Sequence, residues 1–131
     1  MVLAVDIGNS NIVLGCFEGS EIKFVERLST NLNSTELEYS VLMKTILELN
    51  NIDGNTFEGG IISSVVPSVT HTVKKAMERL TGRDIMVVEP GLKTGLKIRL
   101  DNPAQLGSDR VADAVAAINQ KEFDYRSDAD P

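Results

Sequence analysis

The residues best suited to chemistry form a polar turn near the N-terminus, Asp6-Ile7-Gly8-Asn9-Ser10-Asn11. Asp6 follows an apolar run, so we expect its carboxylate at the carboxyl edge of a strand, where it would hold Mg²⁺ through water because Mg²⁺ keeps part of its hydration shell. Gly8 lets a bulky anion approach the backbone, and Asn9, Ser10 and Asn11 bring neutral donors for phosphate oxygens. The turn predicts a phosphate site, although the same residue types also make an ordinary turn.

A second candidate lies between Asn102 and Arg110. Asp109 falls in the first turn of a predicted helix, where the backbone dipole stabilises its anion and where it can orient an attacking hydroxyl. The planar guanidinium group of Arg110 can donate two parallel hydrogen bonds to a carboxylate or phosphate. The alternative is that Ser108 and Asp109 form an ordinary helix cap and that Arg110 is a surface residue.

Other side chains that could take part in catalysis or binding are not surrounded by a recognisable motif. Ser63 and Ser64 end a predicted strand and are expected at the same edge as Asp6. His71 is expected to face solvent from a helix, and Cys16 to be a small buried hydrophobe in a strand. The sequence has no Walker A loop and no G-x-G-x-x-G, and no Ser/His/Asp or Cys/His pair with supporting context for a hydrolase.

Composition and charge narrow the class of protein. The net charge of -6 argues against general nucleic-acid binding. Residues 1–60 carry three basic and nine acidic residues, whereas residues 61–121 carry nine basic and six acidic, a local excess that suits a small anion. No run approaches the ~20 apolar residues needed to span a bilayer, and no signal peptide is expected. The single cysteine excludes an internal disulfide and predicts a cytoplasmic protein.

The elements that must position these residues follow from the apolar pattern. Runs at 2–5, 12–17 and 21–29 predict a three-stranded antiparallel meander. Thr35 and Glu38 form a capping-box signature, and the helix that follows carries an apolar series at helical spacing. That series is Leu37, Val41, Leu42, Ile46 and Leu49.

The rest of the chain alternates strands and helices. We predict a strand at 60–66, and then a helix from Pro67, with an apolar face at Val69, Val73, Ala76, Met77 and Leu80, that is capped by Gly82. Strands at 84–89 and 96–100 and a helix over 107–121 follow. A meander followed by αβαβα implies an α/β fold with a mixed sheet and helices packed on it.

Four motifs in this order resemble the type III pantothenate kinases, a branch of the acetate and sugar kinase/Hsp70/actin superfamily, over residues 1 to about 121. They are the turn at 6–11, Ser63-Ser64-Val65-Val66-Pro67, Gly91-Leu92-Lys93-Thr94-Gly95-Leu96, and Asn102-Pro103 through Gly107-Ser108-Asp109-Arg110. The resemblance implies an actin-like, ribonuclease H-like ATPase domain over 1–121, followed by an acidic tail at 122–131.

In that family ATP phosphorylates the 4′-hydroxyl of pantothenate, the first committed step of coenzyme A synthesis. The resemblance implies that Asp6 acts through Mg²⁺ and that Asp109 is the catalytic base. The implied ATP-binding residues are Asp6, Ile7, Gly8, Asn9, Ser10, Asn11, Ile12 and Val13, and the implied pantothenate-binding residues are Leu100, Gly107, Ser108, Asp109 and Arg110. Family members often carry Tyr in place of Leu100, so a different small hydroxy acid is an open alternative.

The family also has a second domain, which begins with an Asp-x-Gly-Thr-Ala motif and supplies adenine contacts and a site for K⁺ or NH₄⁺. Residues 123–131 lack that motif. We therefore expect an N-terminal half that is inactive alone and that acts as a homodimer or as the complement of a second half. The alternative is a non-catalytic regulatory or accessory module. Neither hypothesis involves nucleic acid or a membrane.

Overall fold

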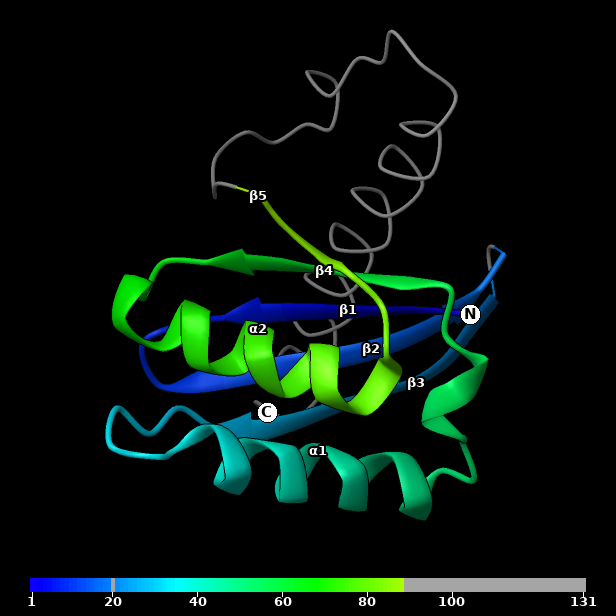
Figure 1. Cartoon of the computed structure of the whole chain (residues 1–131), viewed down its shortest axis with the longest axis horizontal. Coiled ribbons are helices and arrows are strands. Elements are labelled where there is room, and N and C mark those ends of the chain that lie inside the picture. Colours follow the sequence, from blue (N-terminus) through cyan, green and yellow to red (C-terminus); the bar gives the residue numbers. More distant parts are fainter. Residues whose placement is uncertain (20, 89–131) are drawn as a thin grey trace, which may run out of the picture.

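The first three strands form the predicted antiparallel meander, in a computed structural model that describes residues 1–19 and 21–88 (Figure 1). They are β1 (Val2–Ile7), β2 (Asn11–Glu18) and β3 (Glu21–Ser29). The β-branched residues of β1 and β2 favour extended backbone, and the pairing of Ile7 with Ile12 leaves a tight polar turn between the two strands. The meander is confirmed, and the turn lies at its edge.

Two further strands extend the sheet on the other side of β1. β4 (Gly59–Ser64) pairs in parallel with β1, and β5 (Ile85–Val88) pairs in parallel with β4. The strand order is β3-β2-β1-β4-β5, which makes β1 central and brings its carboxyl end beside that of β4. The mixed sheet is confirmed. The strand predicted at 96–100, the helix predicted at 107–121 and the tail at 122–131 lie outside the described residues.

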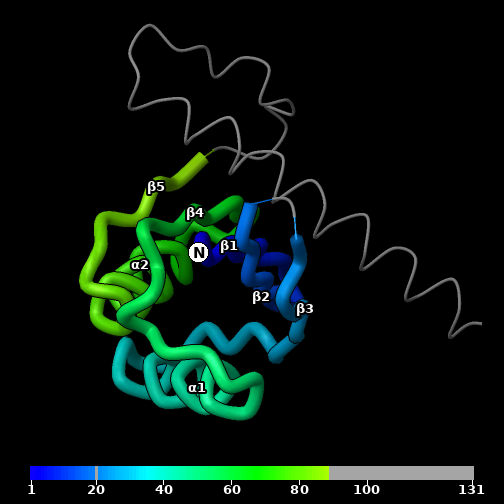
Figure 2. The backbone as a smooth tube through the Cα atoms, turned by 90° about the vertical axis from the view of Figure 1, so that its right-hand side faces the viewer, coloured from blue at the N-terminus to red at the C-terminus, as the bar shows by residue number. Residues whose placement is uncertain are grey.

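Two helices and a short 3₁₀ turn connect these strands. α1 (Glu36–Leu49) and η1 (Gly54–Thr56) lie between β3 and β4, and α2 (Pro67–Thr81) lies between β4 and β5. Both helices cover the same face of the sheet (Figure 2). No helix in the described part of the chain is long and apolar enough to cross a bilayer.

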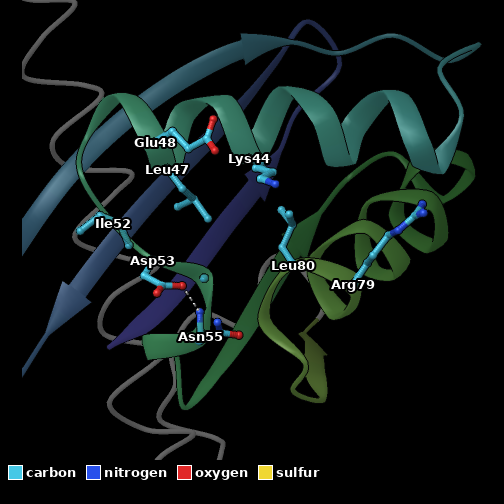
Figure 3. Close-up of a pocket in the computed structure, with 9 residues that line it drawn as sticks. Lys44, Leu47, Glu48, Ile52, Asp53, Asn55, Arg79 and Leu80 are labelled. Atoms are coloured by element: carbon cyan, nitrogen blue, oxygen red, sulfur yellow. Dashed lines mark hydrogen bonds between the residues drawn. The ribbon is translucent and has the colours of Figure 1, made fainter.

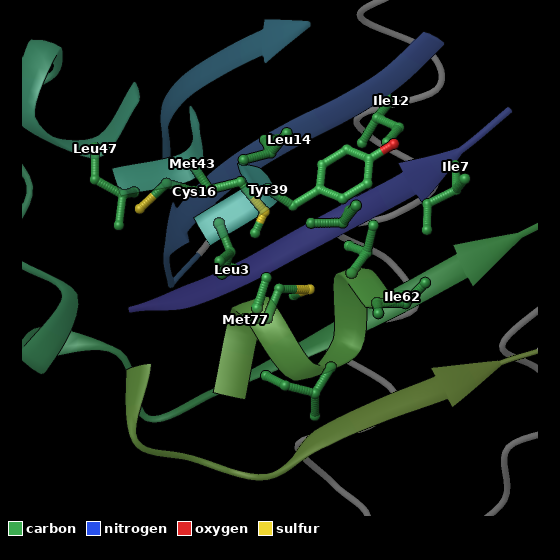
Figure 4. Close-up of a cluster of buried hydrophobic side chains, with 14 of the residues drawn as sticks. Leu3, Ile7, Ile12, Leu14, Cys16, Tyr39, Met43, Leu47, Ile62 and Met77 are labelled. Atoms are coloured by element: carbon green, nitrogen blue, oxygen red, sulfur yellow. The ribbon is translucent and has the colours of Figure 1, made fainter. Parts of the chain in front are cut away.

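The alternation of side chains along the strands divides the core into two clusters. The helix-covered face holds the larger cluster (Figure 4), whose members include Leu3, Val5, Ile7, Ile12, Leu14, Tyr39, Met43, Leu47, Val73 and Met77. The second sheet face holds Ala4, Val13, Phe17 and Ile61. Because neighbours along β1 alternate between the faces, Asp6 lies on the second face with Ala4.

The start of α1 is as predicted, but its buried side is not. Thr35 N–H donates to Glu38 Oε1 at 2.7 Å, and Glu38 N–H donates to Thr35 Oγ1 at 3.2 Å, which completes the capping box. The predicted apolar face is wrong for four of its five residues. Leu37, Val41, Leu42 and Leu49 are exposed, and only Ile46 packs against the core. The sheet instead receives Tyr39, Met43 and Leu47, since α1 has a second apolar stripe that fits it.

The helix α2 agrees with the sequence more closely. Pro67 occupies its first turn, and Gly82 caps its carboxyl end in the left-handed conformation, with φ 69°. Val69, Val73, Ala76 and Met77 are buried as predicted, Leu80 is partly buried, and His71 is exposed. Cys16 is fully buried in β2, and burial raises the pKa of its thiol to about 11, in keeping with an inert hydrophobe.

Two neighbouring glycines in β4 differ in the space around them, which gives a test of this packing. A Cβ on Gly60 would lie 2.8 Å from Ile85 Cδ1 and 3.0 Å from the Leu3 carbonyl oxygen, whereas a Cβ on Gly59 would meet nothing within 4 Å. We expect Gly60→Ala to lower the free energy of unfolding by about 1–3 kcal/mol, because overpacking forces the strands apart. Gly59→Ala should leave it unchanged or raise it by up to about 1 kcal/mol. Urea unfolding of both variants measures the difference, and equal effects would contradict this packing.

Candidate functional site

Asp6 and Ser63 lie side by side at the carboxyl ends of two parallel strands. Asp6 is the penultimate residue of β1, and its register partners are Val13 in β2 and Ser63 in β4. Residues paired across adjacent strands project to the same face, and the strands are about 5 Å apart. The half-buried Asp6 carboxylate and the Ser63 side chain therefore share the second sheet face.

Ser63 is a buried hydroxyl without a partner in the described part of the chain. Its exposed fraction is 8%, and no hydrogen bond of its side chain is formed with residues 1–19 or 21–88. A buried hydroxyl without a hydrogen bond is costly, so its position beside Asp6 suits a water molecule or a ligand oxygen. The orphaned hydroxyl marks this edge as the candidate site.

Ser64, the next residue, has a structural role instead. Its Oγ accepts hydrogen bonds from Val66 N–H at 2.9 Å and from Thr70 Oγ1 at 2.8 Å, which fixes the entry of the chain into α2. It pairs with Ile7, on the helix-covered face. The expectation that both serines share an edge with Asp6 holds in register, but only Ser63 shares its face.

The turn between β1 and β2 is closed by a short backbone hydrogen bond. Gly8 N–H donates to the Asn11 carbonyl oxygen at 2.8 Å, and a Cβ on Gly8 would lie 3.2 Å from that oxygen. Asn9 and Ser10 are exposed at the tip. This arrangement provides polar side chains and backbone groups next to Asp6, within one short segment.

The hydrophobic residues flanking the turn belong to the core. Ile7 and Ile12 have an exposed fraction of 0% and pack on the helix-covered face, and Val13 is buried in the cluster of the second face. Their side chains are therefore occupied with packing.

The donor set at this edge fits a hydrated Mg²⁺ ion. No group of three or more His, Cys, Asp or Glu residues in the described ranges could hold a metal ion. Asp6 supplies one carboxylate, and Ser63 supplies a neutral hydroxyl beside it. Mg²⁺ is commonly held in this way, by one or two carboxylates, several waters and substrate phosphates.

The other predicted site residues, Leu100 and Gly107 to Arg110, lie outside the described residues. Among the described residues, the structure brings together Asp6, the turn and Ser63. It also places Thr30 beside the turn, a residue that is not among the predicted site residues. Thr30 Oγ1 donates to the Gly8 carbonyl oxygen at 2.7 Å. No local signal marks Thr30, because its place beside the turn follows from the pairing of β2 with β3.

A separate pocket lies between the carboxyl half of α1, η1 and the end of α2 (Figure 3). Its charged lining mixes Lys44 and Arg79 with Glu48 and Asp53. It lies by the amino end of β1, because the N-terminal amino group donates to the Thr56 carbonyl oxygen of η1. It is therefore distinct from the Asp6 edge, at the carboxyl end of β1.

Known proteins are similar to this chain in sequence and in fold. A type III pantothenate kinase from Bifidobacterium animalis subsp. lactis is 44% identical over 117 residues, which are 89% of this chain and 46% of that protein. One from Brevibacillus brevis is 43% identical over 119 residues, 91% of this chain and 47% of that protein. This chain spans about half the length of these relatives.

The fold alone is supported by a solved structure. The structure of a ROK hexokinase from Thermus thermophilus superimposes on this chain with a TM-score of 0.51 and 14% sequence identity. The match spans 67% of this chain and 34% of the hexokinase. The expected α/β fold with a mixed sheet is thereby confirmed. The family follows from the sequence match. Residues 2–125 match the family model described as type III pantothenate kinase, and the chain belongs to that family.

Proposed function

We propose that this chain supplies the first phosphate loop and the pantothenate site for ATP-dependent phosphorylation of pantothenate to 4′-phosphopantothenate. The observation that carries the proposal is the family match over residues 2–125. The placement of Asp6 beside the unpartnered Ser63 hydroxyl supports it, because it provides a polar edge next to the phosphate turn. The reaction needs mainly positioning and neutralisation of charge.

In this proposal Asp6 and Ser63 hold Mg²⁺ through its water shell. The bound ion supplies positive charge to the phosphates of ATP. The turn faces the phosphates with the N–H groups of Asn9 and Asn11 and with the Asn9 and Ser10 side chains, since the Gly8 N–H already donates to the Asn11 carbonyl oxygen.

The pantothenate side of the proposal follows from the family resemblance. Asp109 accepts a hydrogen bond from the 4′-hydroxyl and orients it for attack. Gly107, Ser108 and Arg110 bind the rest of the substrate, and Arg110 suits its carboxylate. Leu100 forms an apolar wall without the hydroxyl of the family's tyrosine, so competition by other small hydroxy acids is a test of substrate identity.

Because the chain spans about half the length of its relatives, we also propose that adenine contacts and the K⁺ or NH₄⁺ site belong to the part that it does not span. A homodimer, or a complex with that second half, would then complete the enzyme. As an alternative, the chain is a non-catalytic regulatory or accessory module. The exposed apolar residues of α1, among them Leu37, Val41 and Leu49, favour a role in binding a partner.

A polypeptide of residues 1–131 alone should phosphorylate pantothenate at least about a hundredfold more slowly than a joined enzyme, because ATP is held from one side only. The joined enzyme consists of residues 1–131 followed by the second half of the Brevibacillus brevis relative. A coupled assay of ADP release with pantothenate compares the two. A normal rate from residues 1–131 alone would overturn the half-site proposal.

Asp6→Asn in the joined enzyme should lower kcat/KM for ATP by about 10²–10³-fold and raise the Mg²⁺ concentration needed for half-maximal rate, because the charge that holds the ion is lost. Ser63→Ala should give a smaller loss in the same direction. Asp84→Asn is the matched control, since Asp84 is exposed beyond α2. Steady-state kinetics at several Mg²⁺ concentrations measure these effects. Equal behaviour of Asp6→Asn and Asp84→Asn would remove Asp6 from the site.

Asp109→Asn distinguishes the kinase from the accessory module. In the joined enzyme we expect kcat to fall by about 10²–10⁴-fold while the affinity for MgATP is retained, because only the orientation of the attacking hydroxyl is lost. Turnover and calorimetric titration with MgATP measure the two quantities. The accessory module is supported instead by two results together. The joined enzyme would fail to phosphorylate pantothenate with Asp109 as well as with Asn at this position, and both forms would bind a protein partner equally well.

A further inference from the structure

We infer that Thr30 is a positioning residue of the phosphate turn and that the buried Tyr39 holds Thr30 in place from the core. Thr30, Asn31 and Tyr39 are together called the Thr30 brace. The inference rests on the proposed function, because it assigns a role to residues that do not themselves touch the nucleotide. It starts from hydrogen bonds that join three separate segments of the chain.

Thr30 makes two hydrogen bonds to the turn. It directly follows β3 and lies next to the turn because Ser29 pairs with Asn11. Its Oγ1 donates to the Gly8 carbonyl oxygen at 2.7 Å, and its N–H donates to the Ser10 carbonyl oxygen at 3.0 Å. Two of the carbonyl groups of the turn are thus directed at a single residue.

The direction of these carbonyl groups determines the polarity of the turn. The C=O and the N–H of a trans peptide unit point in opposite directions, and the described residues contain no cis peptide bond. With the Gly8 and Ser10 oxygens directed at Thr30, the N–H groups of Asn9 and Asn11 point away from it. Carbonyl oxygens repel a phosphate, whereas N–H groups attract it. Thr30 therefore gives the turn an anion-binding side.

Tyr39 ties Thr30 to the core of the domain. Its side chain has an exposed fraction of 1%, and its ring lies among the buried residues of the helix-covered face, near Ile12 and Leu14 (Figure 4). Its hydroxyl accepts from Asn31 N–H at 2.9 Å and donates to the Asn31 carbonyl oxygen at 2.8 Å. Both backbone groups of Asn31 are therefore held by one rigid side chain, and Thr30 is the residue directly before it.

The chain offers well-matched variants for a test. Thr30→Val removes the hydroxyl but keeps the shape and the backbone N–H, and Thr30→Ser keeps the hydroxyl. Tyr39→Phe removes only the second hydroxyl of the brace. Thr45→Val is the control, because the exposed Thr45 Oγ1 donates to the Val41 carbonyl oxygen at 2.8 Å in α1, an equivalent bond away from the turn.

The first measurement is amide hydrogen exchange of the 131-residue chain. Two N–H groups report on the turn, because Gly8 N–H donates to the Asn11 carbonyl oxygen and the N–H of residue 30 donates to the Ser10 carbonyl oxygen. Thr30→Val should speed their exchange by about tenfold, the effect of one lost hydrogen bond. Thr30→Ser and Thr45→Val should leave it within about twofold. Unchanged exchange in Thr30→Val, or an equal increase in Thr45→Val, would overturn the brace.

The second measurement is the affinity of the joined enzyme for MgATP, by calorimetry, together with KM for both substrates. Thr30→Val and Tyr39→Phe should weaken MgATP binding by about three- to tenfold and leave KM for pantothenate unchanged, with Thr30→Ser restoring the affinity. Equal losses for both substrates would indicate a merely structural role and contradict the inference. A joined enzyme that binds MgATP but does not phosphorylate pantothenate would contradict the proposed function, while the MgATP affinities still decide the role of Thr30.

Discussion

The parallel pairing of β1 with β4 is the interaction on which both the core and the site depend. Its register aligns Asp6 with Ser63, and it is extended at the two ends by Glu58 N–H to the Met1 carbonyl oxygen at 2.8 Å and by Val65 N–H to the Ile7 carbonyl oxygen at 3.0 Å. Because side chains alternate along a strand, a slip of one residue in β1 would turn Asp6 toward the helices and its apolar neighbours away from them. The burial of apolar side chains thus fixes the register, and the register fixes the site.

The two faces of the sheet have different roles in the domain. The face under α1 and α2 buries the larger apolar cluster and provides most of the hydrophobic stabilisation. On the second face, the apolar cluster gives way at the carboxyl ends of β1 and β4 to Asp6 and Ser63. Polar groups can be placed there without breaking the core, since the strands end at that edge and the backbone turns away. This is also the edge at which open α/β sheets characteristically bind their ligands.

Local sequence signals were sufficient to predict the helices, strands and caps. Non-local packing determines which side of α1 is buried and which residues meet at the turn. The meander, the capping box at Thr35 and the Gly82 cap were predictable because each depends on neighbouring residues. The buried side of α1 was not, since the helix has apolar residues on two sides and only the sheet selects Tyr39 over Leu37. The position of Asp6 at a strand end was predictable, whereas the role of Thr30 depends on a contact with Gly8 across 22 positions of sequence.

The Thr30 brace links the stability of the core to the order of the turn. A phosphate site on a free loop would lose conformational entropy when the ligand binds, at a cost of about 1–2 kcal/mol for each residue that becomes ordered. Here Thr30 donates to two carbonyl oxygens of the turn in the folded domain, and Tyr39 holds the neighbouring Asn31. Donors that are already oriented need no reorganisation when charge develops on the phosphates. The two hydrogen bonds to Asn31 account for a tyrosine, rather than a phenylalanine, at so deeply buried a position. Under the proposed function, they let a core residue on α1 act on the phosphate turn without approaching the nucleotide.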